Sequence, residues 1–180
     1  QAGQLQEAET VYRQILDIKP DFAEAHSNLG TVLQDLGRMD EAVASYHKAL
    51  AINPDYAEAH YNLGIAFQEL GRLEESVASY QKALAIKPDY AEAHNNLGNA
   101  FKDMGKLDEA VSSHHKALAI KPDFTKAHSN LGTVLQELGR LDEAVATYHK
   151  AITIKPDYAE THNILGNALQ DLGKLDEAVS

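Results

Sequence analysis

The sequence predicts an all-α solenoid of stacked helix pairs, and three observations support this fold class. The five prolines recur every 34 residues, at Pro20, Pro54, Pro88, Pro122 and Pro156. The eleven glycines fall into two columns of the same period: Gly3, Gly37, Gly71, Gly105, Gly139 and Gly173, then Gly30, Gly64, Gly98, Gly132 and Gly166. Between these residues, apolar side chains recur at spacings of three and four, which is typical of helices. A fixed period in this range indicates a repeat array.

The repeat has a register that divides the whole chain. Four complete repeats span 23–56, 57–90, 91–124 and 125–158. Residues 1–22 form the second half of a preceding repeat, and residues 159–180 form the first part of a following one. We therefore expect a single array over 1–180, and a chain without a starting Met is expected to be a piece of a longer one.

Each repeat is expected to begin with a helix that follows Asp-Tyr or Asp-Phe. Asp55 is a good N-cap, and Glu58 three residues later would complete a capping box. The helix is expected to end at Gly71, where a residue with positive φ is needed. A second helix then begins near Asp40, Glu74, Asp108 or Asp142 and runs to the Lys-Pro or Asn-Pro pair that stops it.

The second glycine column lies inside the first helix, where Gly costs about 1 kcal/mol relative to Ala. We interpret it as a close-packing device. Small residues recur in the second helix and are expected to face these glycines: Ala42, Ser76, Ala110 and Ala144, then Ala49, Ala83, Ala117 and Ala151.

Composition excludes several function classes. The 16 Lys and Arg against 27 Asp and Glu give a net charge of −11, which argues against broad basic patches for nucleic acid or anionic lipid. The chain has no Cys, so it has no disulfide framework, thiolate zinc site or cysteine nucleophile. No apolar run approaches the ~20 residues of a membrane span, and no signal-peptide pattern is present. We expect a cytoplasmic protein.

The repeat resembles the tetratricopeptide repeat (TPR) family over all 180 residues. One unit reads His60-x2-Leu63-Gly64-x2-Phe67, followed by Ser76, Tyr80, Ala83 and Pro88. The resemblance implies antiparallel helix pairs stacked into a right-handed superhelix, whose first helices line a concave groove. Two features depart from the family pattern. One is His in place of the frequent Trp, and the other is His114 in the column formed by Tyr12, Tyr46, Tyr80 and Tyr148.

Within that family, the run Ala-His-x-Asn-Leu-Gly looks most like the superhelical arm of O-linked N-acetylglucosamine transferases and related bacterial proteins. In those arms a ladder of groove asparagines holds the backbone of an extended peptide. The matching residues are Asn28, Asn62, Asn96 and Asn130, whereas the fifth position is Ile164. A side-chain amide both donates and accepts, so it suits a peptide backbone. The alternative is that these asparagines only cap or bridge neighbouring helices.

Other groove positions follow from the same register. The remaining candidate residues are Tyr61, Asn95, Asn99, Lys102 and Lys126. Glu24, Glu58 and Glu92 make the wall mildly acidic, so neutral or basic segments of a partner protein are expected. Lys102 and Lys126 would hold one anionic group, unless they are scattered surface lysines.

Metal binding and catalysis are not expected. The histidines of the column His26, His60, His94, His128 and His162 stand one per repeat, and a shared ion needs ligands within ~2.2 Å. We interpret them as packing residues and expect no metal and no cofactor. Acidic pairs such as Asp40-Glu41 recur at helix starts, where carboxylates favour the helix dipole, so no enzyme is expected within this chain.

The leading functional hypothesis is a non-enzymatic scaffold that binds an extended peptide or partner protein. The alternative is the substrate-recruiting arm of a glycosyltransferase whose catalytic domain lies outside this chain. A third hypothesis is head-to-tail self-association. At one end Leu165, Leu169 and Leu172 are expected to lack a cover, and at the other end Leu5, Tyr12, Ile15 and Leu16.

Overall fold

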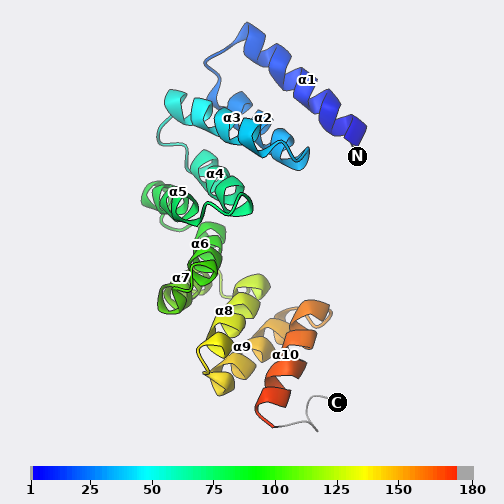
Figure 1. Cartoon of the computed structure of the whole chain (residues 1–180), viewed down its shortest axis with the longest axis vertical. Helices are drawn as coiled ribbons and strands as arrows, with labels where there is room; N and C mark the ends of the chain where they lie inside the picture. The colour runs from blue at the N-terminus through cyan, green and yellow to red at the C-terminus, as the bar shows by residue number, and fades with distance from the viewer. Residues whose placement is uncertain (1, 174–180) are drawn as a thin grey trace. The chain divides into compact units, whose positions relative to one another are not determined.

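The computed structural model describes residues 2–173, which form ten α-helices and no strand (Figure 1). The predicted all-α fold class is therefore confirmed for these residues. The chain divides into two compact units, 1–88 and 89–180.

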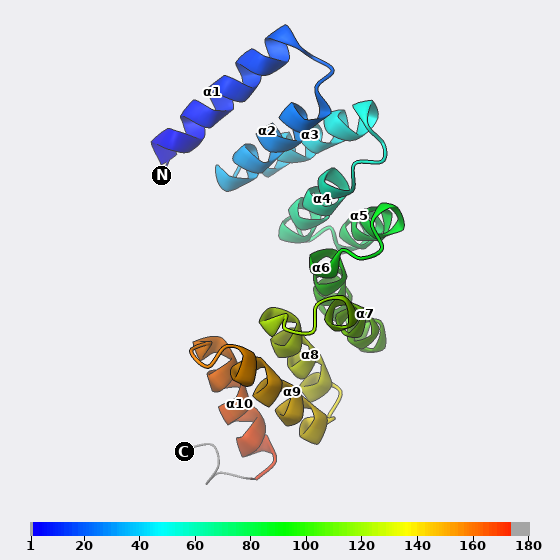
Figure 2. The ribbon, with the colours of Figure 1, turned by 180° about the vertical axis from the view of Figure 1, so that it is seen from behind.

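The first unit contains one single helix and two helix pairs (Figures 1 and 2). Its helices are α1 (Ala2–Ile18), α2 (Ala23–Asp35), α3 (Met39–Ile52), α4 (Ala57–Glu69) and α5 (Leu73–Ile86). Within each pair the helices run antiparallel because a short turn joins them. Helix α1 packs on α2, and α3 packs on α4, so the pairs stack within this unit.

The second unit has the same construction. Its helices are α6 (Ala91–Asp103), α7 (Leu107–Ile120), α8 (Thr125–Glu137), α9 (Leu141–Ile154) and α10 (Ala159–Asp171). The pairs α6/α7 and α8/α9 stack through α7 and α8, and α10 packs on α9. The partner expected for α10 begins near residue 174, outside the described residues.

The turn between paired helices needs glycine, as the sequence predicts. Gly37 has φ +75°, and its N–H donates to the carbonyl of Gln34 at 2.8 Å. The N–H of Arg38 donates to the carbonyl of Leu33, also at 2.8 Å. These two hydrogen bonds form a Schellman motif, which satisfies carbonyls that the helix end leaves free. Later turns repeat the positive φ at Gly71, Gly105, Gly139 and Gly173.

Gly3 departs from this column. It lies inside α1 rather than in a turn, and its φ is not positive. Because α1 has no first helix before it within the described residues, no turn is required there.

The predicted capping box is wrong. Helix α4 begins at Ala57, so its N-cap is the aromatic Tyr56, which makes no side-chain cap hydrogen bond. Asp55 lies one residue too early, in the turn after Pro54, where its backbone N–H donates to Asn53 Oδ1 at 3.3 Å. The same one-residue offset gives aromatic N-caps at Phe22, Tyr90, Phe124 and Tyr158. The second helices begin at Met39, Leu73, Leu107 and Leu141, within one residue of the prediction.

The glycines inside the first helices face an aromatic ring, and this corrects the small-against-small interpretation. A Cβ added to Gly64 would lie 2.6 Å from Tyr80 Cε1, and one added to Gly30 would lie 2.6 Å from Tyr46 Cε1. The ring of His114 stands equally close to Gly98. Ser76 in the small column is also fully buried, and its hydroxyl donates to the Gly64 carbonyl at 2.8 Å. Both residue types therefore pack on the glycine, but the ring is what excludes a side chain.

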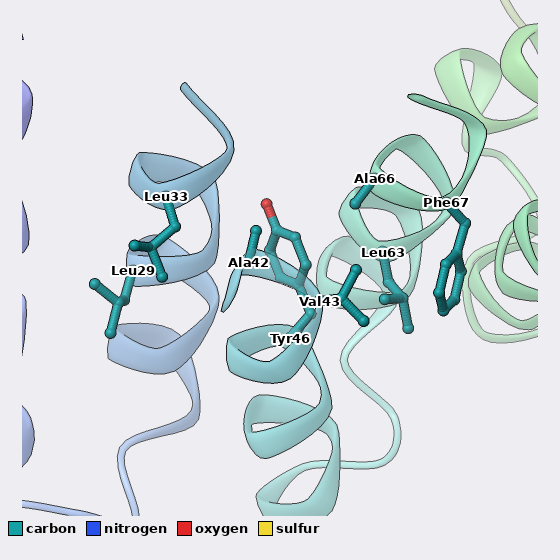
Figure 3. Packing of buried hydrophobic residues seen from close by; sticks show 8 residues of the cluster. All are labelled: Leu29, Leu33, Ala42, Val43, Tyr46, Leu63, Ala66 and Phe67. Atoms are coloured by element: carbon teal, nitrogen blue, oxygen red, sulfur yellow. The ribbon is translucent and has the colours of Figure 1, made fainter. Parts of the chain in front are cut away.

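The core of the first unit forms where three helices meet. Figure 3 shows Tyr46 of α3 between Leu29 and Leu33 of α2 and the α4 residues Leu63 and Phe67. Tyr46 is fully buried, and Tyr12 and Leu16 of α1 pack against the edge of this cluster.

In the second unit the same arrangement places Tyr148 of α9 among residues of α8 and α10. Leu165 and Leu169 belong to this cluster and are only 8% and 3% exposed. The expectation that they lack a cover is therefore wrong, because α9 covers them. At the other end Tyr12 and Leu16 are half-buried, while Val11 and Ile18 of α1 are 47% and 87% exposed.

Candidate peptide-binding surface

The predicted asparagine column lies on successive first helices. Asn28 is exposed on α2, and Asn62 on α4 is half-buried. In the second unit Asn96 on α6 and Asn130 on α8 are also half-buried. A helix interior disfavours Asn relative to Ala or Leu, so local helix propensity does not account for this column.

Three of the candidate residues form a chain of amides in the second unit. The side-chain amide Nδ2 of Asn130 donates to Asn95 Oδ1 at 3.1 Å, and Asn95 Nδ2 donates to Asn96 Oδ1 at 3.3 Å. Asn95 is only 4% exposed, so it acts as a bridge between α6 and α8. The bridging alternative, which concerned the asparagine column, therefore describes the contact that Asn130 makes with Asn95. Asn130 still has its carbonyl oxygen and a second amide hydrogen to offer.

A second set of hydrogen bonds joins neighbouring first helices. It was not predicted from the sequence. The Tyr46 hydroxyl on α3 donates to Gln34 Oε1 on α2 at 3.1 Å. Gln34 Nε2 in turn donates to Glu69 Oε2 on α4 at 3.0 Å. This Tyr–Gln–acid relay links a second helix, its own first helix and the next first helix. Its sequence signal is three columns of Tyr, Gln and acidic residues with a shared period.

The second unit repeats the relay in its last described repeat. Tyr148 donates to Gln136 Oε1 at 3.2 Å, and Gln136 Nε2 donates to Asp171 Oδ2 at 2.8 Å. A buried hydrogen bond of 3.1 Å from Thr161 Oγ1 to Ser129 Oγ also joins α10 to α8. Glu69 and Asp171 therefore each accept an amide hydrogen from the Gln of the preceding first helix.

One repeat replaces the relay with a different pair. His114 and Lys102 stand where the other repeats have Tyr and Gln. His114 is fully buried, and neither ring nitrogen has a hydrogen-bond partner within the described residues. Burial lowers the pKa of His114 to about 4, with smaller contributions from His115 and Lys102. The ring is therefore neutral at physiological pH.

The predicted lysine pair is not joined by any direct contact among the described residues. Lys102 is half-buried and its Nζ lies 3.6 Å from Asp103 Oδ1, while Lys126 is exposed on α8. Asn99 is half-buried on α6. In the first unit, Tyr61 is half-buried on α4, and its ring lies 5.9 Å from the ring of Tyr80.

The histidine column has a structural role in each unit. His60 is buried, and its Nε2 lies 2.9 Å from the carbonyl oxygen of Pro54, which ends the preceding helix pair. Burial lowers the pKa of His60, so the neutral tautomer with a proton on Nε2 suits this contact. His26, His128 and His162 make the same hydrogen bond to Pro20, Pro122 and Pro156. Within residues 2–173 no group of His, Asp or Glu is arranged to hold a metal ion.

Comparison with known proteins gives the family. Tetratricopeptide repeat models match residues 21–89 and 91–124, and a TPR repeat model matches 1–37 and 134–173. A crystal structure of MamA is 30% identical, with a TM-score of 0.80; the match covers 88% of this chain and 92% of that chain. The chain belongs to the tetratricopeptide repeat family. The predicted resemblance to the TPR family is thus confirmed, whereas the resemblance to the O-linked N-acetylglucosamine transferase arm stays a prediction.

Two further TPR structures share the fold at lower identity. The pilF protein of Pseudomonas aeruginosa is 23% identical with a TM-score of 0.87, and covers 98% of this chain and 81% of its own. YrrB, described as a TPR protein with an unusual peptide-binding site, is 20% identical with a TM-score of 0.75, and covers 93% and 86%. Searching the curated proteins returns no match. None of the helices in the described part of this TPR chain is long and apolar enough to cross a membrane.

Proposed function

We propose that this TPR chain is a scaffold that binds an extended segment of a partner protein along the polar surface of its first helices. TPR proteins are typically non-catalytic protein-interaction scaffolds, which gives the general class. The proposal that an extended segment binds along the first helices rests on one observation, which is the amide chain from Asn130 through Asn95 to Asn96.

The amide chain supports the proposal because it orients the outer amide before a ligand arrives. Asn95 is buried and fixes Asn130 by accepting one of its two amide hydrogens. The remaining hydrogen and the carbonyl oxygen of Asn130 then match the C=O and N–H of a peptide backbone. A side chain that is already held loses less conformational entropy on binding than a free one.

Charge favours a neutral or basic segment. Glu24 is exposed and has no ion-pair partner among the described residues, while Glu58 and Glu92 lie 3.6 and 3.5 Å from Lys87 and Lys121. The ion pairs are exposed, so they reduce the acidic potential without removing it. Lys102 and Lys126 add one local place for an anionic group on a segment that is otherwise uncharged.

The proposal is tested by measuring the affinity of labelled 12-residue peptides by fluorescence anisotropy. The peptides form three matched sets, which are neutral, basic and acidic. We expect Asn96→Ala/Asn130→Ala to weaken binding of the neutral and basic sets about fivefold or more, because each of the two lost hydrogen bonds contributes about 0.5–1.5 kcal/mol. Gln81→Ala, an exposed amide on α5, is the matched control. Equal binding by a folded double variant would contradict the proposal.

The glycosyltransferase-arm alternative stays a prediction that concerns the parent protein. A sugar-nucleotide-binding domain in the full-length gene would favour it, and the proposed peptide contacts would then serve substrate recruitment.

A further inference from the structure

The structure contains three cavities built from the same positions of the repeat, and none of them includes a residue of the asparagine column. The first lies between α1 and α3 above α2, with a volume of about 480 Å³. The second lies between α3 and α5 above α4, at about 660 Å³, and the third lies between α7 and α9 above α8, at about 470 Å³. We call them the second-helix cavities, because consecutive second helices form their walls.

Five repeat positions recur in every second-helix cavity. They are a Leu, a Pro, a His, an Ala and a Lys: Leu16, Pro20, His26, Ala44 and Lys48; Leu50, Pro54, His60, Ala78 and Lys82; Leu118, Pro122, His128, Ala146 and Lys150. The His is buried at the floor, where it is held by the Pro carbonyl, and the Ala and Lys are exposed. Such volumes with a mostly apolar lining are in the range of pockets that bind ligands.

The apolar part of these cavities has exposed edges. Ile86 and Ile154 line the second and third cavities and remain 37% and 38% exposed. Phe67 and Leu63 add to the floor of the second cavity. A partner side chain that enters would remove these apolar surfaces from water, which is favourable.

The lysines at the rim of the second-helix cavities indicate which kind of partner would bind there. Lys48, Lys82 and Lys150 make no ion pair within residues 2–173, although the chain as a whole carries a net charge of −11. The first cavity is also lined by Asp17 and Glu41, and the second by Asp55 and Glu75. Glu41 and Glu75 each pair with an arginine, which leaves one carboxylate without such a pair in the described part of the chain at each of these two cavities. The third cavity is lined by Lys150, His128 and His149 and by no carboxylate.

We propose that the second-helix cavities bind an acidic, apolar segment of a partner protein. An apolar side chain of the segment occupies the cavity, and a neighbouring carboxylate pairs with the rim lysine. This charge preference is opposite to that of the asparagine surface. The proposal for the asparagine surface and the proposal for the second-helix cavities can therefore be tested independently.

The test uses a fluorescein-labelled peptide of sequence Leu-Asp-Phe-Glu-Leu-Asp and measures anisotropy at 0.15 M salt. One control peptide replaces the acidic residues with their amides, and another replaces the apolar residues with Ser. Burial of one Leu or Phe is expected to raise affinity about tenfold or more over the Ser peptide. Loss of either feature should weaken binding, and equal binding by all three peptides would overturn the proposal.

Two sets of variants locate the site. Lys48→Gln/Lys82→Gln/Lys150→Gln should weaken binding at least threefold, and Ala44→Phe/Ala78→Phe/Ala146→Phe should abolish it by filling the cavities. Lys106→Gln/Lys121→Gln/Lys155→Gln removes the same charge elsewhere and should have no effect. If this control weakens binding as much as the first set, or if the first set has no effect, the proposal fails. The exposed lysine variants keep the test valid if the Phe variants misfold, which circular dichroism would reveal.

Other occupants give different results. If decanoate binds in competition with the dye 8-anilinonaphthalene-1-sulfonate and the acidic peptide does not bind at all, the cavities hold a lipid-like anion and the peptide proposal is overturned. If light scattering shows dimers that the Phe variants abolish, the occupant is a second copy of the chain, and the proposal is likewise overturned. Asn96→Ala/Asn130→Ala should leave acidic-peptide binding unchanged.

Discussion

Asn130 on α8 donates its side-chain amide to Asn95 Oδ1 on α6 at 3.1 Å, and this contact joins two first helices through residues that are 35 positions apart. Asn95 is buried, whereas Asn130 is half-buried and makes no other side-chain hydrogen bond among the described residues. The contact therefore serves the packing of the repeats and the presentation of the outer amide together.

The ring-against-glycine contact predicts that Gly64→Ala destabilises the protein. The new Cβ would lie 2.6 Å from the Tyr80 ring, and overpacking of this kind costs about 1–3 kcal/mol, which exceeds the gain in helix propensity. Thermal unfolding followed by circular dichroism measures the change. Gly166→Ala is the matched control, because no atom of residues 2–173 lies within 4 Å of its Cβ position, and it should be neutral or stabilising by up to about 1 kcal/mol. A lower melting temperature for both variants would contradict this explanation.

The turn geometry predicts a cost for Gly71→Ala without any steric contact. Gly71 has φ +71° and open space around its Cβ position, so the cost of about 1–2 kcal/mol comes from the left-handed backbone alone. Gly3→Ala changes a glycine of the same column that lies within helix α1. It should not destabilise the protein in urea unfolding, and equal losses for the two variants would show that the positive φ is not the cause.

Because His114 is buried, we predict that the free energy of unfolding falls as the pH is lowered. Its folded-state pKa is about 4, below the ordinary value of 6.5, so the unfolded chain takes up a proton first as the pH falls. His114 therefore stabilises the fold fully above pH 6.5, and this contribution is lost between pH 6.5 and 4, on the order of 3 kcal/mol in total. The charged or titratable neighbours that contribute to the shift are His115 and Lys102.

Urea unfolding at pH 7 and at pH 4.5 measures this loss. Lys102→Gln/His114→Tyr restores the pair found in the other repeats and should lose less stability over the same interval. If the variant and the native chain lose equal stability, His114 is not the acid-sensitive residue.

Exposed apolar residues on α1 predict self-association at high concentration. Val11 and Ile18 are 47% and 87% exposed, and a second copy would cover them. Light scattering should show a mass that rises with concentration, and Val11→Ser/Ile18→Ser should reduce this rise. Ile120→Ser on α7 is the control and should not change it. A monomer at every concentration would contradict the prediction.

The sequence predicted the helices well because their signals are local. Gly37 and its equivalents need positive φ, and prolines stop the second helices, so periodicity alone located these boundaries within a residue or two. The helix starts were harder, because an Asp one residue before the aromatic N-cap looks the same in sequence as an N-cap Asp.

The site contacts could not be predicted to the same extent, since they depend on pairs of side chains from different helices. The small-residue columns suggested Ala facing Gly, while the Tyr80 ring takes the space beside Gly64. The link from Tyr46 through Gln34 to Glu69 needs three helices in register. Likewise, no sequence pattern indicated that Asn95 would be buried as a bridge while its partner Asn130 is only half-buried.

The central claim is that a partner segment binds to the amides of the first helices. Its most direct test is nuclear magnetic resonance of the isotope-labelled chain titrated with the best neutral or basic peptide, observing the side-chain amide signals of Asn96 and Asn130. We predict that these signals shift on saturation, while the backbone signals of the exposed second-helix residues Ala44, Ala78 and Ala146 stay in place. Unchanged asparagine signals in the presence of bound peptide would contradict the claim.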